Sequence, residues 1–395
     1  MPLHGEHVCA ECFEDEDICA FVREHLEFDE CSYCGKTSDG GASIAANVEE
    51  VIDFIEGKLS AEYEDPVLQV GWCSAEGGWL GVNVYESTHE LFMDGLGGFP
   101  CSNDELIDDI TRHIGDTREW VDRDPYMLSP GQGLSSGWME FCRLVKHRTR
   151  FMFFPPDARE NDHEPEAVAP GQILAKIGEL IQSAAMVRTL PAGTHFYRAR
   201  THASGASFTT VDELAPPPDD MPVTNRMNPA GIPMFYGALE RATAIQEVKS
   251  AQLSAASIGQ FELINEIRVV DLTALPPIRG IFADGTRREK AAIGFLHEFV
   301  EDATLPIERD GREHIEYVPT QIVTEYFRHR FLYEYGPGKK SQVYGILYPS
   351  SKAEDGINAV LFFDRFSCEG IEEESHYPKK KMLRLLTTET IDPLP

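Results

Sequence analysis

The sequence has no apolar run that approaches the roughly 20 residues needed to cross a bilayer. Its first residues, Met1–Glu6, also lack the basic start and the apolar stretch of a secretory signal peptide. The nine cysteines are an odd number without a secretory context, which argues against a disulfide framework. These absences predict a cytoplasmic protein with reduced thiols that is not embedded in a membrane.

Positive charge is also scarce. The chain has 35 Lys and Arg residues against 66 Asp and Glu residues, for a formal net charge of -31. The resulting field repels phosphates, so we expect neither nucleic acid nor a membrane surface as a partner. A phosphate-bearing ligand would have to be bound by arginines placed locally. Hydrophobic residues are 42% of the 395 residues, which is enough for packed cores in two or three domains.

Two Cys-x-x-Cys pairs lie near the N-terminus, at a separation typical of a four-cysteine zinc site. Each pair can turn the backbone so that two thiolates face one ion, and four thiolates complete a tetrahedron. The alternative is a set of free or redox-active cysteines, but a redox pair normally opens a helix in a βαβ unit. The sequence therefore predicts a structural Zn²⁺ in an element of residues 1–42, with the ligands Cys9, Cys12, Cys31 and Cys34.

Residues 43–160 are predicted to form a mainly helical accessory domain. Apolar residues recur at helical spacing in three segments, 43–60, 103–114 and 137–150. The stretch 155–166 is polar and rich in proline, which is typical of a linker. We therefore expect a domain boundary here, with the linker itself over residues 161–172.

Three short patterns imitate functional motifs. The first, Gly131-Gln132-Gly133, resembles the start of a dinucleotide fingerprint but has no strand before it. The second, Arg143 with His147, suggests the arginine–histidine pair of helical ribonucleases, at a shorter spacing. The third, residues 338–341, lacks the first glycine of a phosphate loop. We expect ordinary structural roles for all three, such as a solvated helix end or a turn.

Residues 173–395 are predicted to form an α+β domain with a mixed or mostly antiparallel sheet, because strands and helices do not alternate regularly. Strands 261–264 and 267–272 are expected to pair as a hairpin around Asn265-Glu266. The other expected strands are 194–199, 233–238, 343–349, 358–363 and 381–386. The expected helices are 173–187, 240–250, 287–303 and 319–332.

Several polar residues of this domain are spaced like parts of one site for an anion and a sugar: Arg198, Arg226, Tyr236 and Glu247. Each has a plainer interpretation when taken alone. An arginine on a strand commonly forms a surface ion pair, and a glutamate on a helix commonly faces solvent. A tyrosine at a strand end is commonly half-buried packing.

Four segments in this order resemble the RES family, over about residues 173–390. The segments are Phe196-Tyr197-Arg198-Ala199-Arg200, residues 225–236, Ala244-Ile245-Gln246-Glu247-Val248 and Tyr348-Pro349-Ser350-Ser351. The family is named for an Arg-Glu-Ser set and comprises bacterial toxin components that destroy NAD⁺. The resemblance implies a fold similar to ADP-ribosyltransferases. The upstream part resembles the HEPN/RES-associated N-terminal domain that is fused to some of these proteins.

Carried over residue by residue, the resemblance implies that Arg198 and Arg226 bind the pyrophosphate of NAD⁺. Planar guanidinium groups bind such oxyanions through two parallel hydrogen bonds. Glu247 would stabilise an oxocarbenium-like state at the ribose, while Tyr236 would offer an aromatic face to the nicotinamide. Ser350 or its neighbour would hydrogen-bond the ribose or the attacking group. The family's usual Arg-Trp-Asn is here Arg-Met-Asn, so a packing role of the tryptophan is not carried over.

The sequence therefore predicts an enzyme that cleaves the nicotinamide–ribose bond of NAD⁺, by phosphorolysis or by hydrolysis. In a bacterial toxin–antitoxin or defence system it would be held by a cognate antitoxin. One alternative is a mono-ADP-ribosyltransferase that uses the same donor site to modify a protein. A second alternative, of another class, is a catalytically inactive interaction protein that contains zinc. Phosphate or water as the attacking group, and the oligomeric state, stay open at this point.

Overall fold

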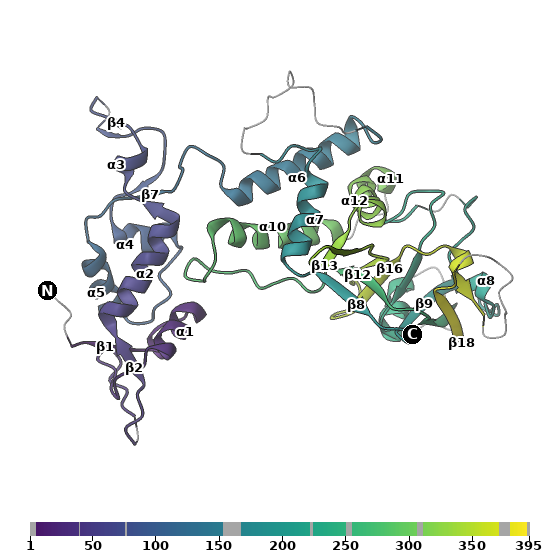
Figure 1. The fold of residues 1–395 in the computed structure, drawn as a ribbon, viewed down its shortest axis with the longest axis horizontal. Helices are drawn as coiled ribbons and strands as arrows, with labels where there is room; N and C mark the ends of the chain where they lie inside the picture. Colours follow the sequence, from purple (N-terminus) through teal and green to yellow (C-terminus); the bar gives the residue numbers. More distant parts are fainter. Residues whose placement is uncertain are drawn as a thin grey trace. The chain divides into compact units, whose positions relative to one another are not determined.

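The computed structural model describes residues 5–38, 40–75, 77–152, 167–221, 224–249, 255–305, 311–370 and 380–392. The stretch 155–166, predicted as a linker, lies outside these residues. The chain divides into two compact units. The first consists of Met1–Gln132 with Pro277–Ala292, and the second of Gly133–Pro276 with Ile293–Pro395 (Figure 1).

The first unit is built from helices with short strands between them. Its helices are α1 (Glu16–Glu24), α2 (Val48–Glu62), α3 (Pro66–Gln69), α4 (Thr88–Glu90) and α5 (Asp104–Ile114). Strand β1 (His7–Cys9) pairs with β2 (Ala45–Asn47), and β4 (Trp72–Cys73) pairs with β5 (Gly78–Trp79). A three-stranded sheet has the order β3 (Tyr63–Glu64), β7 (Trp120–Asp122), β6 (Val84–Tyr85).

Helix α2 begins later than the apolar spacing predicts, because residues 45–47 pair with β1 as a strand. The helix starts where the Asn47 side chain accepts a hydrogen bond from the backbone N–H of Glu49 at 2.8 Å. Its inner face is fully buried: Val48, Val51, Ile52, Ile55 and Leu59. This face anchors the core of the first unit.

A segment from late in the sequence completes this core. Phe282 is 2% exposed and belongs to the same buried cluster as α2. Its ring meets that of Phe99 edge-on, with the centroids 5.9 Å apart. Nearby, Arg287 pairs with Glu62 at 3.2 Å. Residues 277–292 therefore pack within the first unit although they follow a strand of the second.

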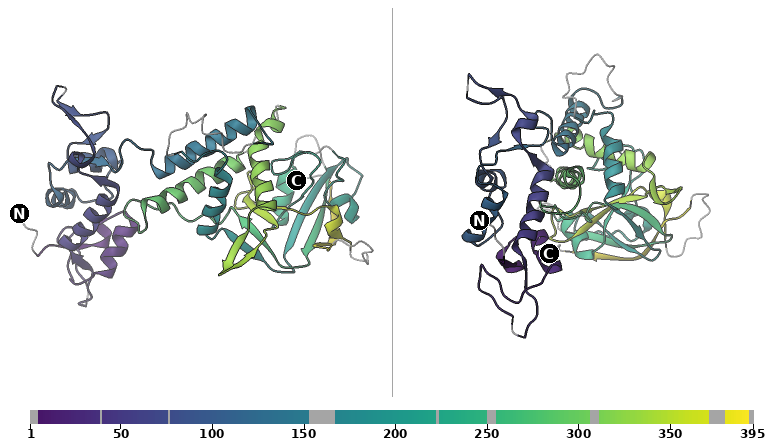
Figure 2. Two further views of the ribbon diagram at one scale, coloured as in Figure 1. Left: turned by 45° about the horizontal axis from the view of Figure 1, so that its top comes forward. Right: turned by 60° about the vertical axis from the view of Figure 1, so that its left-hand side comes forward.

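The second unit contains a nine-stranded mixed sheet (Figure 2). Its order is β17 (Cys368–Glu369), β18 (Leu383–Ile391), β11 (Ala255–Leu263), β9 (His195–His202), β10 (Phe235–Ala238), β16 (Ile357–Leu361), β15 (Gly345–Pro349), β12 (Ile267–Asp271), β8 (Val187–Leu190). The pairs β12–β15 and β17–β18 are parallel and the others antiparallel. The predicted α+β class with a mixed sheet is confirmed.

The helices of this unit are α6 (Pro130–His147), α7 (Ile173–Ser183), α8 (Val211–Leu214), α9 (Arg241–Val248), α10 (Arg287–Thr304), α11 (Glu313–Glu316) and α12 (Val318–His329), of which α6 and α10 begin with residues assigned to the first unit. The longer helices lie at the expected segments, whereas the short helices α8 and α11 were not predicted. A separate hairpin joins β13 (Tyr333–Gly336) to β14 (Lys339–Ser341). None of the helices among the described residues is long and apolar enough to cross a membrane.

The hairpin predicted around Asn265-Glu266 is wrong, because β11 and β12 are not neighbours in the sheet. Strand β11 lies between β18 and β9, whereas β12 lies between β15 and β8. Both edges of β11 are already in use as the chain leaves it. Leu263 donates to Thr194 O at 2.8 Å, and Ile264 donates to Met382 O at 2.9 Å. The chain therefore moves on to a distant place in the sheet.

The three imitated motifs have structural roles. The glycines near residue 131 lie in the first turns of α6, and residues 338–341 lie in the β13–β14 hairpin. On α6, Arg143 forms an ion pair with Glu140 at 2.7 Å, and His147 is the last residue of the helix. These placements agree with the ordinary interpretation of each pattern.

Three phenylalanines fix the strands β9, β10 and β11 of the large sheet. Phe196, Phe235 and Phe261 are fully buried on β9, β10 and β11. Their rings meet edge-on, with centroids 6.4 Å and 5.0 Å apart in successive pairs. Because successive side chains of a strand point to opposite faces, Tyr197 and Tyr236 are turned to the other face of the sheet.

Candidate functional site

The four N-terminal cysteines lie together, with their sulfur atoms all within 4.8 Å of one another. The Sγ–Sγ distances are 3.8 Å for Cys9–Cys12, 3.5 Å for Cys9–Cys34 and 3.7 Å for Cys12–Cys31. A tetrahedron of sulfurs around Zn²⁺, with bonds of about 2.3 Å, has edges of about 3.8 Å. The set therefore has the spacing of a four-thiolate metal site.

The surroundings of these thiols suit a buried cation. Burial, followed by the hydrogen bond with Cys34, raises the pKa of Cys9 to about 11. Burial would also raise the pKa of Cys31, but backbone N–H groups, including that of Cys34, lower it to about 7. Burial raises the pKa of Cys12 strongly. Because packed thiolates repel one another, a bound metal ion would stabilise the ionised form of such a cluster.

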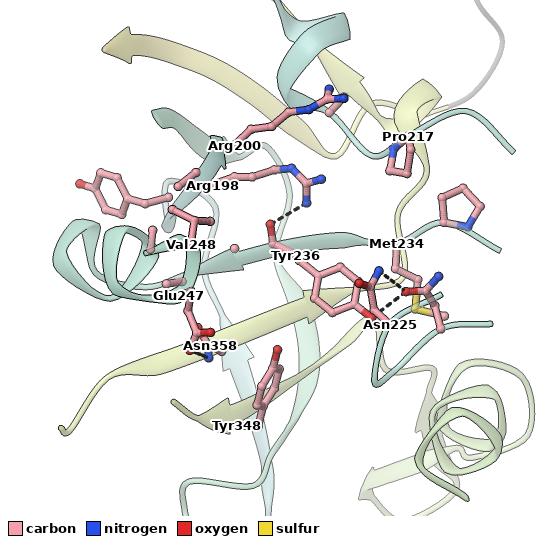
Figure 3. A pocket seen from close by; sticks show the side chains of 18 of the residues that line it. Arg198, Arg200, Pro217, Asn225, Met234, Tyr236, Glu247, Val248, Tyr348 and Asn358 are labelled. Carbon is pink, nitrogen blue, oxygen red and sulfur yellow. Dashed lines mark hydrogen bonds between the residues drawn. The ribbon is translucent and has the colours of Figure 1, made fainter. Parts of the chain in front are cut away.

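The second unit contains a pocket of about 400 Å³ that is lined in part by residues of β9, β10 and β16 (Figure 3). Its lining residues are Tyr197, Arg198, Ala199, Arg200, Ala215, Pro217, Met221, Asn225, Asn228, Pro233, Met234, Tyr236, Gly237, Ala238, Ala244, Glu247, Val248, Tyr348 and Asn358. Small-molecule sites of about 300–1,000 Å³ are usual in proteins. Of the five residues predicted for the site, three line this pocket.

Arg198 crosses the pocket from β9 and has no carboxylate partner among the described residues. Its Nη1 donates to Tyr236 O at 2.8 Å, and its guanidinium lies 5.5 Å from the centre of the Phe235 ring. The buried Nε has no partner in the described part of the chain. Burial lowers the pKa of Arg198 to about 10, so it stays charged near neutral pH. A buried cation with a free donor is suited to an anionic ligand.

Glu247 is held at the last turn of α9, which packs against β9. Its Oε1 accepts hydrogen bonds from Ser350 Oγ at 2.5 Å and from Asn358 Nδ2 at 2.6 Å. Both donors bind the same oxygen, which leaves Oε2 without a recorded partner among the described residues. The carboxylate is therefore fixed in orientation while one oxygen remains available to a ligand.

The loop after β15 brings Ser350 to this carboxylate. Ser350 Oγ also accepts from the backbone N–H groups of Lys352 and Ala353, at 3.1 and 3.0 Å. The backbone N–H of Ser350 donates to Gly356 O at 2.8 Å. A Cβ at position 356 would lie 2.7 Å from Thr243 Oγ1, so only glycine lets α9 approach this loop so closely. Ser350 lies behind Glu247 and does not itself line the pocket.

Tyr236 lines the same pocket as Arg198 and Glu247. Its hydroxyl donates to Asn228 Oδ1 at 2.8 Å and accepts from the Met227 backbone N–H at 3.3 Å. Burial raises its pKa above the usual value. The ring is therefore fixed by its hydroxyl, and one edge or face is left toward the pocket.

Arg226 does not line the pocket. Its Nη1 donates to Ala303 O at 3.1 Å at the end of α10, and its carbonyl accepts from Thr320 Oγ1 at 2.7 Å. The next residue, Met227, is 2% exposed, and its sulfur accepts from Thr324 Oγ1 at 3.3 Å. This loop is thus bound to α10 and α12, and the methionine fills the interior position that follows the arginine.

Arg200, Tyr348 and Asn358 are among the polar residues of the pocket that were missed in the sequence. Arg200 was visible as the second arginine of Arg-Ala-Arg, since alternate residues of a strand share a face. Tyr348 and Asn358 are paired across β15 and β16. No spacing rule links Asn358 to Glu247, which is brought to it only by the arrangement of the sheet.

Comparison with known proteins gives two family matches. The RES domain model matches residues 195–379, and the HEPN/RES N-terminal domain 1 model matches residues 24–159. The first match contains all five residues predicted for the site, and the second begins between the two cysteine pairs. No curated protein and no solved structure matches the chain. RES domains are associated with enzymes that act on NAD⁺. The chain therefore contains a RES domain, preceded by a HEPN/RES N-terminal domain 1.

Proposed function

We propose that the pocket of the RES domain binds NAD⁺ and that the protein cleaves its nicotinamide–ribose bond. The observation that carries this proposal is the pairing of two incompletely satisfied groups across one pocket. One is the Arg198 guanidinium, which has a buried free donor and no carboxylate partner in the described chain. The other is the Glu247 carboxylate, which is held through a single oxygen.

Arg198 would bind the diphosphate of NAD⁺. In a chain of net charge -31, phosphates are repelled at long range. A guanidinium inside a pocket can still bind them, because a charge-assisted hydrogen bond in a partly buried site is roughly twice as strong as a neutral one. Removing an anion from Arg198 would leave its Nε without a partner, so the empty pocket is the less satisfied state.

Glu247 would stabilise the charge that develops on the ribose during cleavage. When the C1″–N bond breaks, its electron pair returns to the nicotinamide ring, which becomes neutral and leaves. Positive charge then develops on the ribose ring, and a fixed carboxylate stabilises it. Glu247 Oε2 is free to face this charge or to accept a hydrogen bond from a ribose hydroxyl. Ser350 and Asn358 keep the carboxylate oriented while this happens.

The attacking group supplies an oxygen to C1″ and releases a proton. Phosphate would give ADP-ribose-1″-phosphate, and water would give ADP-ribose, with nicotinamide in both cases. A protein nucleophile would make the same donor site a mono-ADP-ribosyltransferase. Phosphate, water and a protein acceptor would all use the same pocket, so analysis of the products must identify which of them attacks C1″.

We propose that the N-terminal cysteines hold a structural Zn²⁺. All four ligand positions are sulfur and their distances match one tetrahedron, so the site would be closed to substrate. Its role would be to stabilise the first unit, in which Cys9, Cys12 and Cys31 are buried. As a toxin, the protein would also require an antitoxin partner that restrains it in the cell.

The test of the proposed reaction is NAD⁺ turnover by the purified full chain, with and without inorganic phosphate. We expect release of nicotinamide, and product mass identifies the acceptor. Labelled NAD⁺ incubated with cell extract reports transfer to protein in the same experiment. If NAD⁺ stays intact in all three mixtures while the protein is folded, the proposed function is wrong.

A further inference from the structure

The strand β9 places two arginines on the pocket, and only one of them matches a family position. Arg198 and Arg200 are alternate residues of β9, so both side chains leave the same face of the sheet. Both line the pocket, and both extend across it in the same direction in Figure 3.

Arg200 is available for a ligand. Its Nη1 donates to the carbonyl oxygen of Glu213, and its guanidinium lies 5.0 Å from the centre of the Phe208 ring. It has no ion pair with a carboxylate of the described chain. The nearby Glu213 carboxylate is occupied by Thr209 N at 2.9 Å and by Thr210 N at 3.0 Å. The guanidinium is therefore positioned by a backbone carbonyl and an aromatic ring, without an ion pair to a carboxylate of the described chain.

Arg226, the other candidate for an anion, is committed elsewhere. It lies outside the pocket and donates to Ala303 O at 3.1 Å. The backbone on either side is held by α12, where Gln321 Nε2 donates to Asn225 O at 2.9 Å. Moving this guanidinium into the pocket would break a contact that ties the loop to α10.

We propose that Arg198 and Arg200 together form the diphosphate subsite of the pocket, and that Arg226 positions the loop 225–228. The identity of the ligand rests on the proposed function, but the anion subsite does not. Two like charges on one strand face repel each other, and the charge of Arg200 contributes to the lowered pKa of Arg198. A diphosphate placed between them removes this repulsion and satisfies Arg198 Nε.

This subsite also sets the direction of the ligand. Glu247 and Asn358 lie at one end of the pocket, and Pro217 and Met234 lie at the other, beyond the arginines. With the diphosphate at β9, the nicotinamide ribose faces Glu247. The adenosine then lies against the end of the pocket that carries Pro217 and Met234.

The experiment measures binding of ADP by titration calorimetry to the full chain, with adenosine as the ligand without phosphate. Arg200→Ala should weaken ADP binding about ten- to a hundredfold and leave adenosine binding within about twofold. Arg241→Ala is the matched control, because this exposed arginine pairs with Glu389 outside the pocket and its loss changes the net charge equally. It should leave both affinities unchanged.

Arg226→Gln should lower the melting temperature and weaken ADP binding less than Arg200→Ala does. The inference is overturned if the native protein binds no ADP, if Arg200→Ala binds ADP normally, or if Arg241→Ala loses as much affinity. NAD⁺ turnover separates the two proposals. If ADP binding depends on Arg200 but NAD⁺ is not cleaved, the proposed reaction is wrong and the proposed diphosphate subsite stands. If NAD⁺ is cleaved but Arg200→Ala binds ADP normally, only the proposed subsite is wrong.

Discussion

The cysteine cluster of the first unit and the pocket of the second are assembled in opposite ways. The cluster consists of four cysteines from residues 9–34, and their sulfur atoms lie within 4.8 Å of one another. The pocket takes different side chains from residues 197–358 and leaves Arg198 Nε and Glu247 Oε2 without partners in the described chain. A closed set of this kind stabilises a fold, while an incompletely satisfied set can bind and react.

This contrast predicts a clean separation of effects. A change to the closed set should reduce stability and leave the chemistry of the pocket untouched in folded protein. A change to the open set should reduce binding or turnover at nearly constant stability. Variants that mix the two effects would show that the comparison is wrong.

The largest effect is expected for Cys12→Ser. Structural zinc binds zinc-finger peptides with about 10–16 kcal/mol of apparent free energy, so losing one ligand should cost the first unit more than about 5 kcal/mol. We expect metal analysis to show loss of zinc and calorimetry to show an early unfolding transition. Cys101→Ser is the control, because this half-buried cysteine lies outside the cluster. Protein that is purified without zinc and melts like the native chain would contradict the closed site.

The next effect is expected for Glu247→Gln, which removes a charge with little change in volume. Turnover of NAD⁺ should fall about 10²–10³-fold or more, since the loss of one preorganised electrostatic group has effects of this size. The melting temperature should stay within a few degrees. Glu240→Gln is the control, because Glu240 begins the same helix outside the pocket. Full NAD⁺ consumption by Glu247→Gln would remove the proposed mechanism.

The same contrast explains why the sequence predicts the cysteine cluster more completely than the pocket. The four cysteines were found because the spacing of each pair is local and one residue type supplies every ligand. Most of the longer helices and most strands of the large sheet were found by periodicity, but the partner of β11 was not, because turn residues do not reveal that both its edges are in use. Asn358 was missed for a related reason: it reaches Glu247 only through the pairing of β10 with β16.

A smaller effect is expected for Arg198→Ala. Losing a buried charge-assisted contact to the diphosphate should raise the Kd for NAD⁺ about ten- to a hundredfold. Stability should change little or rise, because the variant removes a charge whose burial is unfavourable without an anion. Calorimetric titration of NAD⁺ into the Glu247→Gln background measures this without turnover. An unchanged Kd would place the diphosphate elsewhere.

The smallest effect is expected for Asn358→Leu, which keeps the volume of a 5% exposed side chain and removes one donor to Glu247. Ser350 would still hold Oε1, so the carboxylate should stay in place but rotate more freely. The loss of one charge-assisted hydrogen bond should therefore lower kcat about tenfold and leave the KM for NAD⁺ nearly unchanged. Asn265→Leu removes a comparable amide that lies outside the pocket lining and donates to Lys381 O at 3.3 Å, and it should leave kcat unchanged. A loss confined to KM, or an equal loss in both variants, would mean that Asn358 supports the fold and does not orient the carboxylate. Because Asn358 touches only Glu247 among the charged groups of the pocket, this variant tests whether orientation, separately from charge, contributes to the open site.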